Sequence, residues 1–99
     1  MEKLIGPKKI KIAVFISGRG SNLNNLIKFS KLKNYPFLVS LIISNTKKAE
    51  GLRFSKKYGI EKKIIRYEKN FQIDKKILKI LKKRNIKLIC LAGFMKILS

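Results

Sequence analysis

Residues 9–27 read KIKIAVFISGRGSNLNNLI and divide into three parts. Residues 10–16 are an almost unbroken run of aliphatic and aromatic side chains, which is typical of a buried strand. The polar turn 17–22 contains two glycines, and the apolar residues Leu23, Leu26 and Ile27 then recur at helical spacing. The stretch therefore predicts a buried strand that leads through a glycine turn into a helix.

A turn of this kind is a common anion-binding site. The first backbone N–H groups of a helix have no partner within the helix, and the helix dipole adds partial positive charge there. Gly18 and Gly20 permit the close approach of a ligand, and Ser21 and Asn22 add short polar side chains. We expect a phosphate-bearing ligand at residues 20–22, although the same residues also suit an ordinary capped turn. The spacing matches neither G-x-x-x-x-G-K-[ST] nor G-x-G-x-x-G.

The composition limits the chemistry that the chain can carry. Its 99 residues, 45% of them hydrophobic, suffice for one small domain with a core. The single cysteine, Cys90, excludes an internal disulfide and lies in an apolar run, so we expect a buried, unreactive thiol. With no histidine, the usual zinc sites and a Ser-His-Asp triad are excluded within this chain. No segment is apolar enough for a membrane span or a signal peptide, so we expect a cytoplasmic protein without a metal.

The formal net charge is +20, from 25 Lys and Arg residues against 5 Asp and Glu residues. An excess of this size favours nucleic acid or another anionic partner. Lysine dominates, however, and arginine is the residue better suited to base and phosphate readout. The lysines are spread over every predicted element, and the aromatic residues do not alternate with them as in a stacking platform. We therefore expect attraction to small anions and no specific nucleic-acid partner.

The rest of the chain repeats the alternation of apolar strands and amphipathic helices. Residues 34–36 (Asn-Tyr-Pro) break the first helix, and Gly59 and Asn85 mark the ends of the next two. Residues 93–99 are expected to form an exit loop. The predicted strands span residues 9–16, 38–44, 63–67 and 86–92, and the predicted helices span residues 21–32, 47–58 and 72–84.

This alternation predicts an α/β, Rossmann-like three-layer fold with a mainly parallel sheet. Strand–helix–strand units form parallel sheets with right-handed crossovers. The near-continuous apolar character of the strands agrees with this, because a parallel sheet is covered on both faces. Ligands of such sheets bind beyond the carboxyl ends of the strands. Four loops are expected at that edge: residues 17–22, 44–48, 67–71 and 93–99.

Five segments resemble the N-terminal half of the folate-dependent phosphoribosylglycinamide formyltransferases of purine synthesis. They occur in order as residues 12–23 (IAVFISGRGSNL), 43–45 (ISN), 51–52 (GL), 59–60 (GI) and 91–99 (LAGFMKILS). The first and last segments together are specific. The resemblance implies transfer of a formyl group from 10-formyltetrahydrofolate, the co-substrate, to the amine of glycinamide ribonucleotide.

The resemblance also implies roles for individual residues. Gly20, Ser21 and Asn22 would hold the ribonucleotide phosphate. The family's catalytic asparagine and histidine, in an Asn-x-His-Pro-Ser stretch, and its later aspartate have no counterpart in residues 1–99. We therefore assign no catalytic residue in this chain, and we expect a truncated fold.

A second group of residues matches the family's folate pocket. The matching loop lines that pocket through backbone groups and apolar contacts, and it corresponds here to Met95, Lys96, Ile97 and Leu98. Core packing is the alternative role for the apolar members. Arginine is the common family residue at position 96, and Lys96 keeps the charge without the planar guanidinium. The family's arginine before the third helix is not carried over, because Lys69 and Asn70 are the nearest residues here.

We expect a basic extension over residues 1–8 and the nucleotide-binding half of a formyltransferase domain over residues 9–99. Glycinamide ribonucleotide and the folate are the expected partners, and the oligomeric state stays open. The alternatives within the enzymes are a formyltetrahydrofolate deformylase and a methionyl-tRNA formyltransferase, which share the folate-binding architecture. A small basic nucleic-acid-binding module is a further alternative. The turn at residues 20–22 favours the ribonucleotide enzyme.

Overall fold

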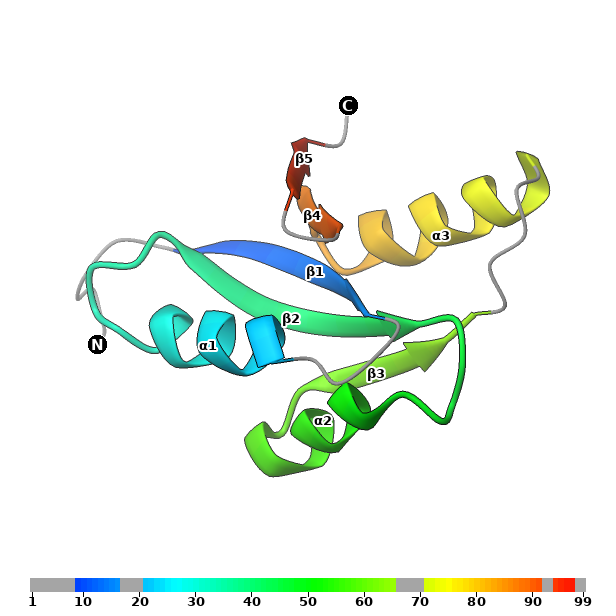
Figure 1. Cartoon of the computed structure of the whole chain (residues 1–99). Coiled ribbons are helices and arrows are strands. Elements are labelled where there is room, and N and C mark those ends of the chain that lie inside the picture. The colour runs from blue at the N-terminus through cyan, green and yellow to red at the C-terminus, as the bar shows by residue number, and fades with distance from the viewer. Residues whose placement is uncertain (1–8, 17–20, 66–70, 92–93, 98–99) are drawn as a thin grey trace.

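A computed structural model describes residues 9–16, 21–65, 71–91 and 94–97 of the chain. Its described strands form one sheet in the order β3-β2-β1-β4-β5, with helices on both faces (Figure 1). The parallel strands are β1 (Ile10–Ile16), β2 (Phe37–Ser44), β3 (Glu61–Ile64) and β4 (Leu88–Leu91), and β5 (Phe94–Ile97) is antiparallel to β4. The helices are α1 (Ser21–Ser30), α2 (Arg53–Tyr58) and α3 (Phe71–Lys83), with a 3-10 turn η1 (Glu50–Leu52) before α2. The predicted Rossmann-like α/β fold is confirmed.

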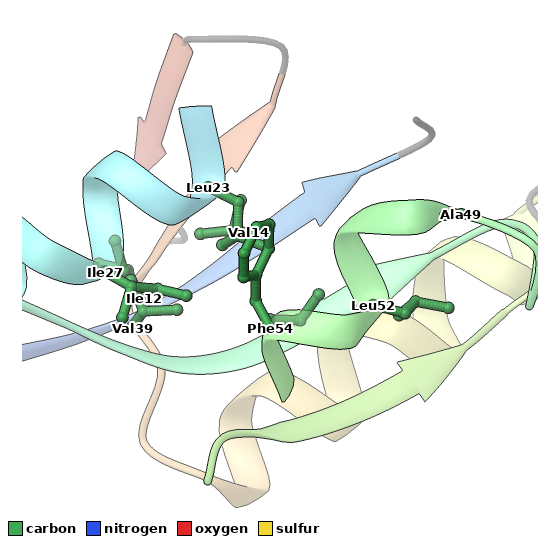
Figure 2. Close-up of a cluster of buried hydrophobic side chains, with 9 residues drawn as sticks. Ile12, Val14, Leu23, Ile27, Val39, Ala49, Leu52 and Phe54 are labelled. Atoms are coloured by element: carbon green, nitrogen blue, oxygen red, sulfur yellow. The ribbon is translucent and has the colours of Figure 1, made fainter. Parts of the chain in front are cut away.

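Each face of the sheet has its own hydrophobic core. On one face, α1, η1 and α2 pack on β1 and β2. Ile42 is buried there together with the side chains labelled in Figure 2: Ile12, Val14, Leu23, Ile27, Val39, Ala49, Leu52 and Phe54. On the other face, α3 covers β1, β2 and β4 through a second set: Ala13, Leu41, Ile43, Ile65, Ile77, Leu81, Ile86 and Ile89. Burial on both faces explains why the central strands are apolar at nearly every position.

A bulge in β2 keeps its side chains in phase with those of β1. Ile12 pairs with Val39, whereas Ala13 pairs with Leu41, so Ser40 is the extra residue. Side chains alternate between the faces of a regular strand, and Val39 and Ile42 would then point in opposite directions. The extra residue places both of them in the core beneath α1.

The third strand differs from its predicted range of 63–67. It spans Glu61–Ile64 and pairs with β2 from Leu41 to Ser44, and the N–H of Ile65 continues the ladder by donating to the carbonyl oxygen of Ser44 at 2.8 Å. Residues 66–67 lie outside the described residues. β3 is the edge strand of the described sheet. Charged side chains protect an edge strand from pairing with further strands, and the sequence Glu-Lys-Lys-Ile accordingly contains no apolar run.

The second helix begins later than its predicted start at residue 47. The N–H of Lys48 donates to Oγ1 of Thr46 at 3.2 Å, and Oγ of Ser44 accepts from the N–H of Thr46 at 3.1 Å. Short hydroxyl side chains that bond to nearby backbone groups compete with helix formation. Helical structure therefore starts only at Glu50, as the 3-10 turn η1.

The first helix ends at Ser30, two residues before the predicted end at residue 32. Oγ of Ser30 donates to the carbonyl oxygen of Ile27 at 2.7 Å, and Nζ of Lys9 donates to the carbonyl oxygens of Leu32, at 2.6 Å, and Ser30. These bonds satisfy carbonyl groups that the end of a helix leaves without partners. Leu32, a predicted member of the buried face of this helix, is 55% exposed in the turn that follows.

The predicted exit loop at residues 93–99 contains strand β5. Its residues pair with β4 in antiparallel register, from Leu91 opposite Phe94 to Leu88 opposite Ile97. Only residues 92 and 93 separate the two strands, and two-residue connections are the commonest in hairpins. On β4, Cys90 is a half-buried free thiol that packs against the core beneath α1, so the expectation of a buried thiol was wrong in its degree of burial.

Candidate functional site

The first turn of α1 lies where the sequence predicts the anion site. β1 ends at Ile16 and α1 begins at Ser21, so the helix starts at the carboxyl edge of the sheet (Figure 1). Gly20 lies outside the described residues, Ser21 is the first residue of α1, and the side chain of Asn22 is exposed. Leu23 is buried in the core beneath α1 and fixes this turn to the sheet. The helix start is therefore held in place with its N–H groups at the ligand-binding edge of the fold.

The positive end of α1 is not balanced by an acidic side chain. An Asp or Glu in the first turn of a helix stabilises the dipole. The first turns of α1 and α2 have none, whereas η1 begins with Glu50 and α3 has Asp74 in its first turn. Since a carboxylate in that position would repel a phosphate, its absence from Ser21–Ser30 suits an anion site.

The loop after β2 stands next to this turn. Ser44 pairs with Ile16, so the segments that leave β1 and β2 start side by side. Ser44 is only 1% exposed, and its Oγ donates to the carbonyl oxygen of Thr46 at 2.6 Å while accepting from the N–H of that residue. Asn45 is exposed beyond this turn. The hydroxyl of Ser44 thus sets the course of the loop, a role that a serine at the end of an apolar strand, followed by Asn-Thr, could have indicated.

A side-chain bridge joins α1 to α2 one turn beyond the candidate site. Oη of Tyr58 donates to Oδ1 of Asn24 at 2.7 Å. Nζ of Lys31 lies 4.9 Å, and Nζ of Lys57 5.3 Å, from the centroid of the same ring, at cation–π distance. Asn24 is therefore occupied in joining the two helices, whereas Asn22, in the first turn, and Asn25 are exposed.

The residues predicted to line the folate pocket lie at the opposite end of the strand order from β3. Met95, Lys96 and Ile97 form β5 together with Phe94, and Leu98 lies outside the described residues. Met95 pairs with Cys90 near the carboxyl end of β4, whereas Ile97 pairs with Leu88 at its start. Only β4 stands between β1 and β5, so Met95 is the member of this group nearest the edge that carries the α1 turn.

The described residues offer binding groups at this edge and no acid–base pair. The pKa of Glu61 is lowered and that of Arg84 is raised by their mutual hydrogen bonds, and these residues lie at the start of β3 and after α3, not on the segments that leave the carboxyl ends of the strands. Among the described residues, no cluster of His, Cys, Asp or Glu could hold a metal ion, and no helix is long and apolar enough to cross a membrane. The arrangement can therefore hold an anion, and it leaves proton transfer to other groups.

Comparison with known proteins assigns this architecture to one group of enzymes. A profile of the family described as formyl transferase matches residues 10–99. The trifunctional purine biosynthetic protein adenosine-3 of Gallus gallus is 39% identical over 96% of this chain, which spans 10% of that protein. The phosphoribosylglycinamide formyltransferase of Haemophilus influenzae is 36% identical over 90% of this chain, which spans 43% of that protein.

Solved structures agree with these sequence matches. The phosphoribosylglycinamide formyltransferase of Anaplasma phagocytophilum superimposes with a TM-score of 0.71 at 35% identity, over 93% of this chain and 43% of that one. The corresponding enzyme of Brucella melitensis gives a TM-score of 0.75 at 31% identity, over 93% of this chain and 50% of that one. The chain thus spans half or less of these relatives.

Proposed function

Because the chain belongs to the formyl transferase family, we propose that it takes part in formyl transfer from 10-formyltetrahydrofolate to the amine of glycinamide ribonucleotide. In this proposal residues 9–99 form the nucleotide-binding half of a formyltransferase domain, and residues 1–8 are a basic extension. The half supplies the site for the substrate phosphate and part of the folate pocket. The relatives named as phosphoribosylglycinamide formyltransferases support this choice.

The observation that carries the proposal is the start of α1. Its first turn is fixed to the core by Leu23, lies at the carboxyl edge of a parallel sheet and has no carboxylate to oppose a phosphate. We propose that Gly20, Ser21 and Asn22 hold the ribonucleotide phosphate there, through backbone N–H groups and the two short polar side chains. The chain's net charge of +20 adds long-range attraction for an anionic substrate.

We propose that the folate binds along β5. Met95, Lys96, Ile97 and Leu98 would line its pocket, with strand backbone for hydrogen bonds and apolar side chains for the ring system. Lys96 would offer a cation to a folate carboxylate, although as a point charge and without the fork of an arginine. Only β4 separates β1 from β5 in the sheet. This arrangement is consistent with one pocket that holds both substrates at the carboxyl edge.

Proton transfer in this reaction would fall to groups outside residues 1–99. The attacking amine must lose a proton, and the tetrahedral oxyanion needs a hydrogen-bond donor. The chain has no histidine, and its described carboxylates at the helix starts belong to Glu50 and Asp74, which precede α2 and open α3. We therefore assign binding and positioning, but no catalytic residue, to this chain.

Calorimetric titration of the chain tests the proposal and the tRNA formyltransferase alternative together. Glycinamide ribonucleotide should bind about tenfold or more tightly than glycinamide riboside, which lacks the phosphate, because charge-assisted hydrogen bonds to a helix start are lost with it. Asn22→Ala should reduce this preference without abolishing it, because the backbone N–H groups remain, and Asn25→Ala, at an exposed position of the same helix, should leave it intact. Equal affinity for the two ligands would contradict the phosphate site. A preference for methionyl-tRNA over the same tRNA without its amino acid would favour the tRNA formyltransferase instead, because the two carry nearly the same phosphate charge.

A further inference from the structure

A patch of apolar side chains is exposed at the amino edge of the sheet, at the opposite end of β1 and β2 from the candidate site. We call it the aromatic patch and define it by residues from the end of α1, the turn that follows and the first positions of β1 and β2: Ile10, Phe29, Leu32, Tyr35 and Phe37. Leu32 is 55%, Phe29 53% and Ile10 42% exposed, and the rings of Tyr35 and Phe37 are half-buried. Nothing in the proposed reaction uses this surface.

The aromatic patch is held in a fixed shape. The rings of Phe29 and Tyr35 are stacked with centroids 6.2 Å apart, and Tyr35 meets Phe37 edge-on at 5.7 Å. Two backbone hydrogen bonds fix the turn between Phe29 and Tyr35. The N–H of Leu32 donates to the carbonyl oxygen of Phe29 at 3.0 Å, and the N–H of Tyr35 donates to the carbonyl oxygen of Leu32 at 3.1 Å. Nζ of Lys9 also donates to the carbonyl oxygen of Leu32. A preformed apolar surface has little ordering entropy to lose when a partner binds.

The charged side chains on the described segments that build the aromatic patch are all positive. Lys28, Lys31 and Lys33 lie on the same segment as its aromatic residues, and Lys9 lies beside Ile10. None of the chain's five acidic residues falls between residues 3 and 49, the part of the sequence that builds β1, α1 and β2. A second copy of the chain would bring the same lysines against these, so self-association through this surface is opposed by charge.

We propose that the aromatic patch docks an acidic polypeptide segment that presents apolar side chains between its carboxylates. The lysines complement the carboxylates, and the exposed rings and aliphatic groups complement the apolar side chains. Nucleic acid fits this surface less well. Phe29 and Tyr35 turn their faces toward each other and so offer less area for stacking bases, and no arginine occurs between residues 20 and 52. This inference does not depend on the proposed function.

Fluorescence anisotropy with designed probes tests the docking surface. The first probe is a labelled peptide with glutamate and leucine at helical spacing, the second has serine for each leucine, and the third is single-stranded oligothymidylate of equal charge. The Glu-Leu peptide should bind about tenfold more tightly than the Glu-Ser peptide, because apolar contact adds to charge attraction. The double variant Phe29→Ser, Leu32→Ser should abolish this difference. Leu78→Ser, at a leucine 38% exposed on α3, is the matched control and should preserve it.

Each other outcome overturns the inference. Equal binding of the two peptides, or a double variant that still prefers the Glu-Leu peptide with unchanged melting temperature, would show that the aromatic patch is not the docking surface. Oligothymidylate that binds more tightly than the Glu-Leu peptide, and is weakened by the double variant, would assign the surface to nucleic acid. Concentration-dependent sedimentation abolished by the double variant would assign it to a second copy. An affinity that rises about tenfold when residues 1–8 are removed would make those residues the occupant.

Discussion

Two helices of this chain end with the same residue-level device. Gly59 has φ +66° and Asn85 has φ +57°, and each is followed by an isoleucine whose N–H bonds to a carbonyl oxygen five residues earlier. The N–H of Ile60 donates to the carbonyl oxygen of Ser55 at 2.9 Å, and the N–H of Ile86 donates to the carbonyl oxygen of Leu81 at 3.0 Å. These are the left-handed residue and the backbone bond of a Schellman motif, which caps the end of a helix and turns the chain toward the next strand.

We predict that Gly59→Ala lowers the free energy of unfolding by about 1 kcal/mol. A Cβ at Gly59 would meet no atom within 4 Å, so the cost arises from the positive φ alone and not from a clash. Asn85→Gly is the matched control, since it relieves the same conformation, and it should change stability by less than about 0.5 kcal/mol. Urea unfolding of the three proteins measures both effects. A fully stable Gly59→Ala variant would show that this helix end does not need the left-handed conformation.

An ion pair between β3 and the end of α3 makes stability depend on pH. Nε and Nη2 of Arg84 each donate to a carboxylate oxygen of Glu61 at 2.7 Å. These hydrogen bonds, helped by Coulomb attraction to Arg84 and Lys63 and opposed by partial burial, hold the pKa of Glu61 below its ordinary value of 4.5. A pKa lowered by folding means that the pair stabilises the fold above pH 4.5 and that this contribution is lost as the pH falls through the lowered pKa.

We predict that Glu61→Gln lowers the melting temperature at neutral pH and that the difference from the parent protein closes in acid, below the folded-state pKa of Glu61. The effect should be small and reduced by salt, because the Glu61 side chain is 44% exposed. Melting curves over a pH series give the answer. A difference that stayed constant down to the acid end would mean that the substitution acts through packing and not through the lost charge.

Among the elements, α3 shows most directly how an amphipathic pattern produces a layer of the fold. Its buried residues Ile77 and Leu81 are spaced by one turn and pack beneath the sheet, while lysines occupy the outer face. We predict that Leu81→Ala, at a side chain with no exposed surface, lowers the free energy of unfolding by about 2–5 kcal/mol. Leu78→Ala, on the outer face of the same helix, should cost less than about 1 kcal/mol. Similar losses from the two variants, in denaturant titrations, would contradict the packing described here.

The elements that sequence reasoning placed well are those with strong apolar patterns. Strands β1, β2 and β4 and helices α1 and α3 lie close to their predicted ranges, because burial on a fixed side dictates their side chains. Strand β3 was misplaced because an edge strand needs few apolar residues, and its ladder depends on backbone bonds that any side chain permits. Strand β5 was not predicted, because it is defined by its pairing with β4, and a segment of a few residues does not reveal its pairing partner.

At the candidate site, the sequence predicted the position of the helix start but not the side-chain contacts around it. The glycine turn after β1 indicated where α1 would begin, and the structure places Ser21 there. The turn built by Ser44 and Thr46, and the Tyr58–Asn24 bridge between α2 and α1, were not predicted. Both join residues whose partners depend on side-chain orientation, and in the second case the residues are 34 positions apart.

For the whole molecule, the asymmetry between its two edges is the feature that matters most for binding. The carboxyl edge presents a helix start without a carboxylate, and the amino edge presents the aromatic patch, with one exposed and two half-buried rings, among lysines. The net charge of +20 attracts anions to both, so charge alone does not separate a specific site from general attraction. A decisive measurement must locate the bound phosphate on the molecule.

That measurement is the amide chemical-shift map of the isotope-labelled chain, titrated with glycinamide ribonucleotide and then with glycinamide riboside. We predict the largest shifts at residues 20–23 with the ribonucleotide and their loss with the riboside, because only the ribonucleotide carries the phosphate that the α1 N–H groups would bind. The start of α3, which has Asp74 in its first turn, is the internal control and should stay unshifted. Shifts spread over the lysine-bearing surface, or equal shifts with both ligands, would contradict a phosphate site at α1.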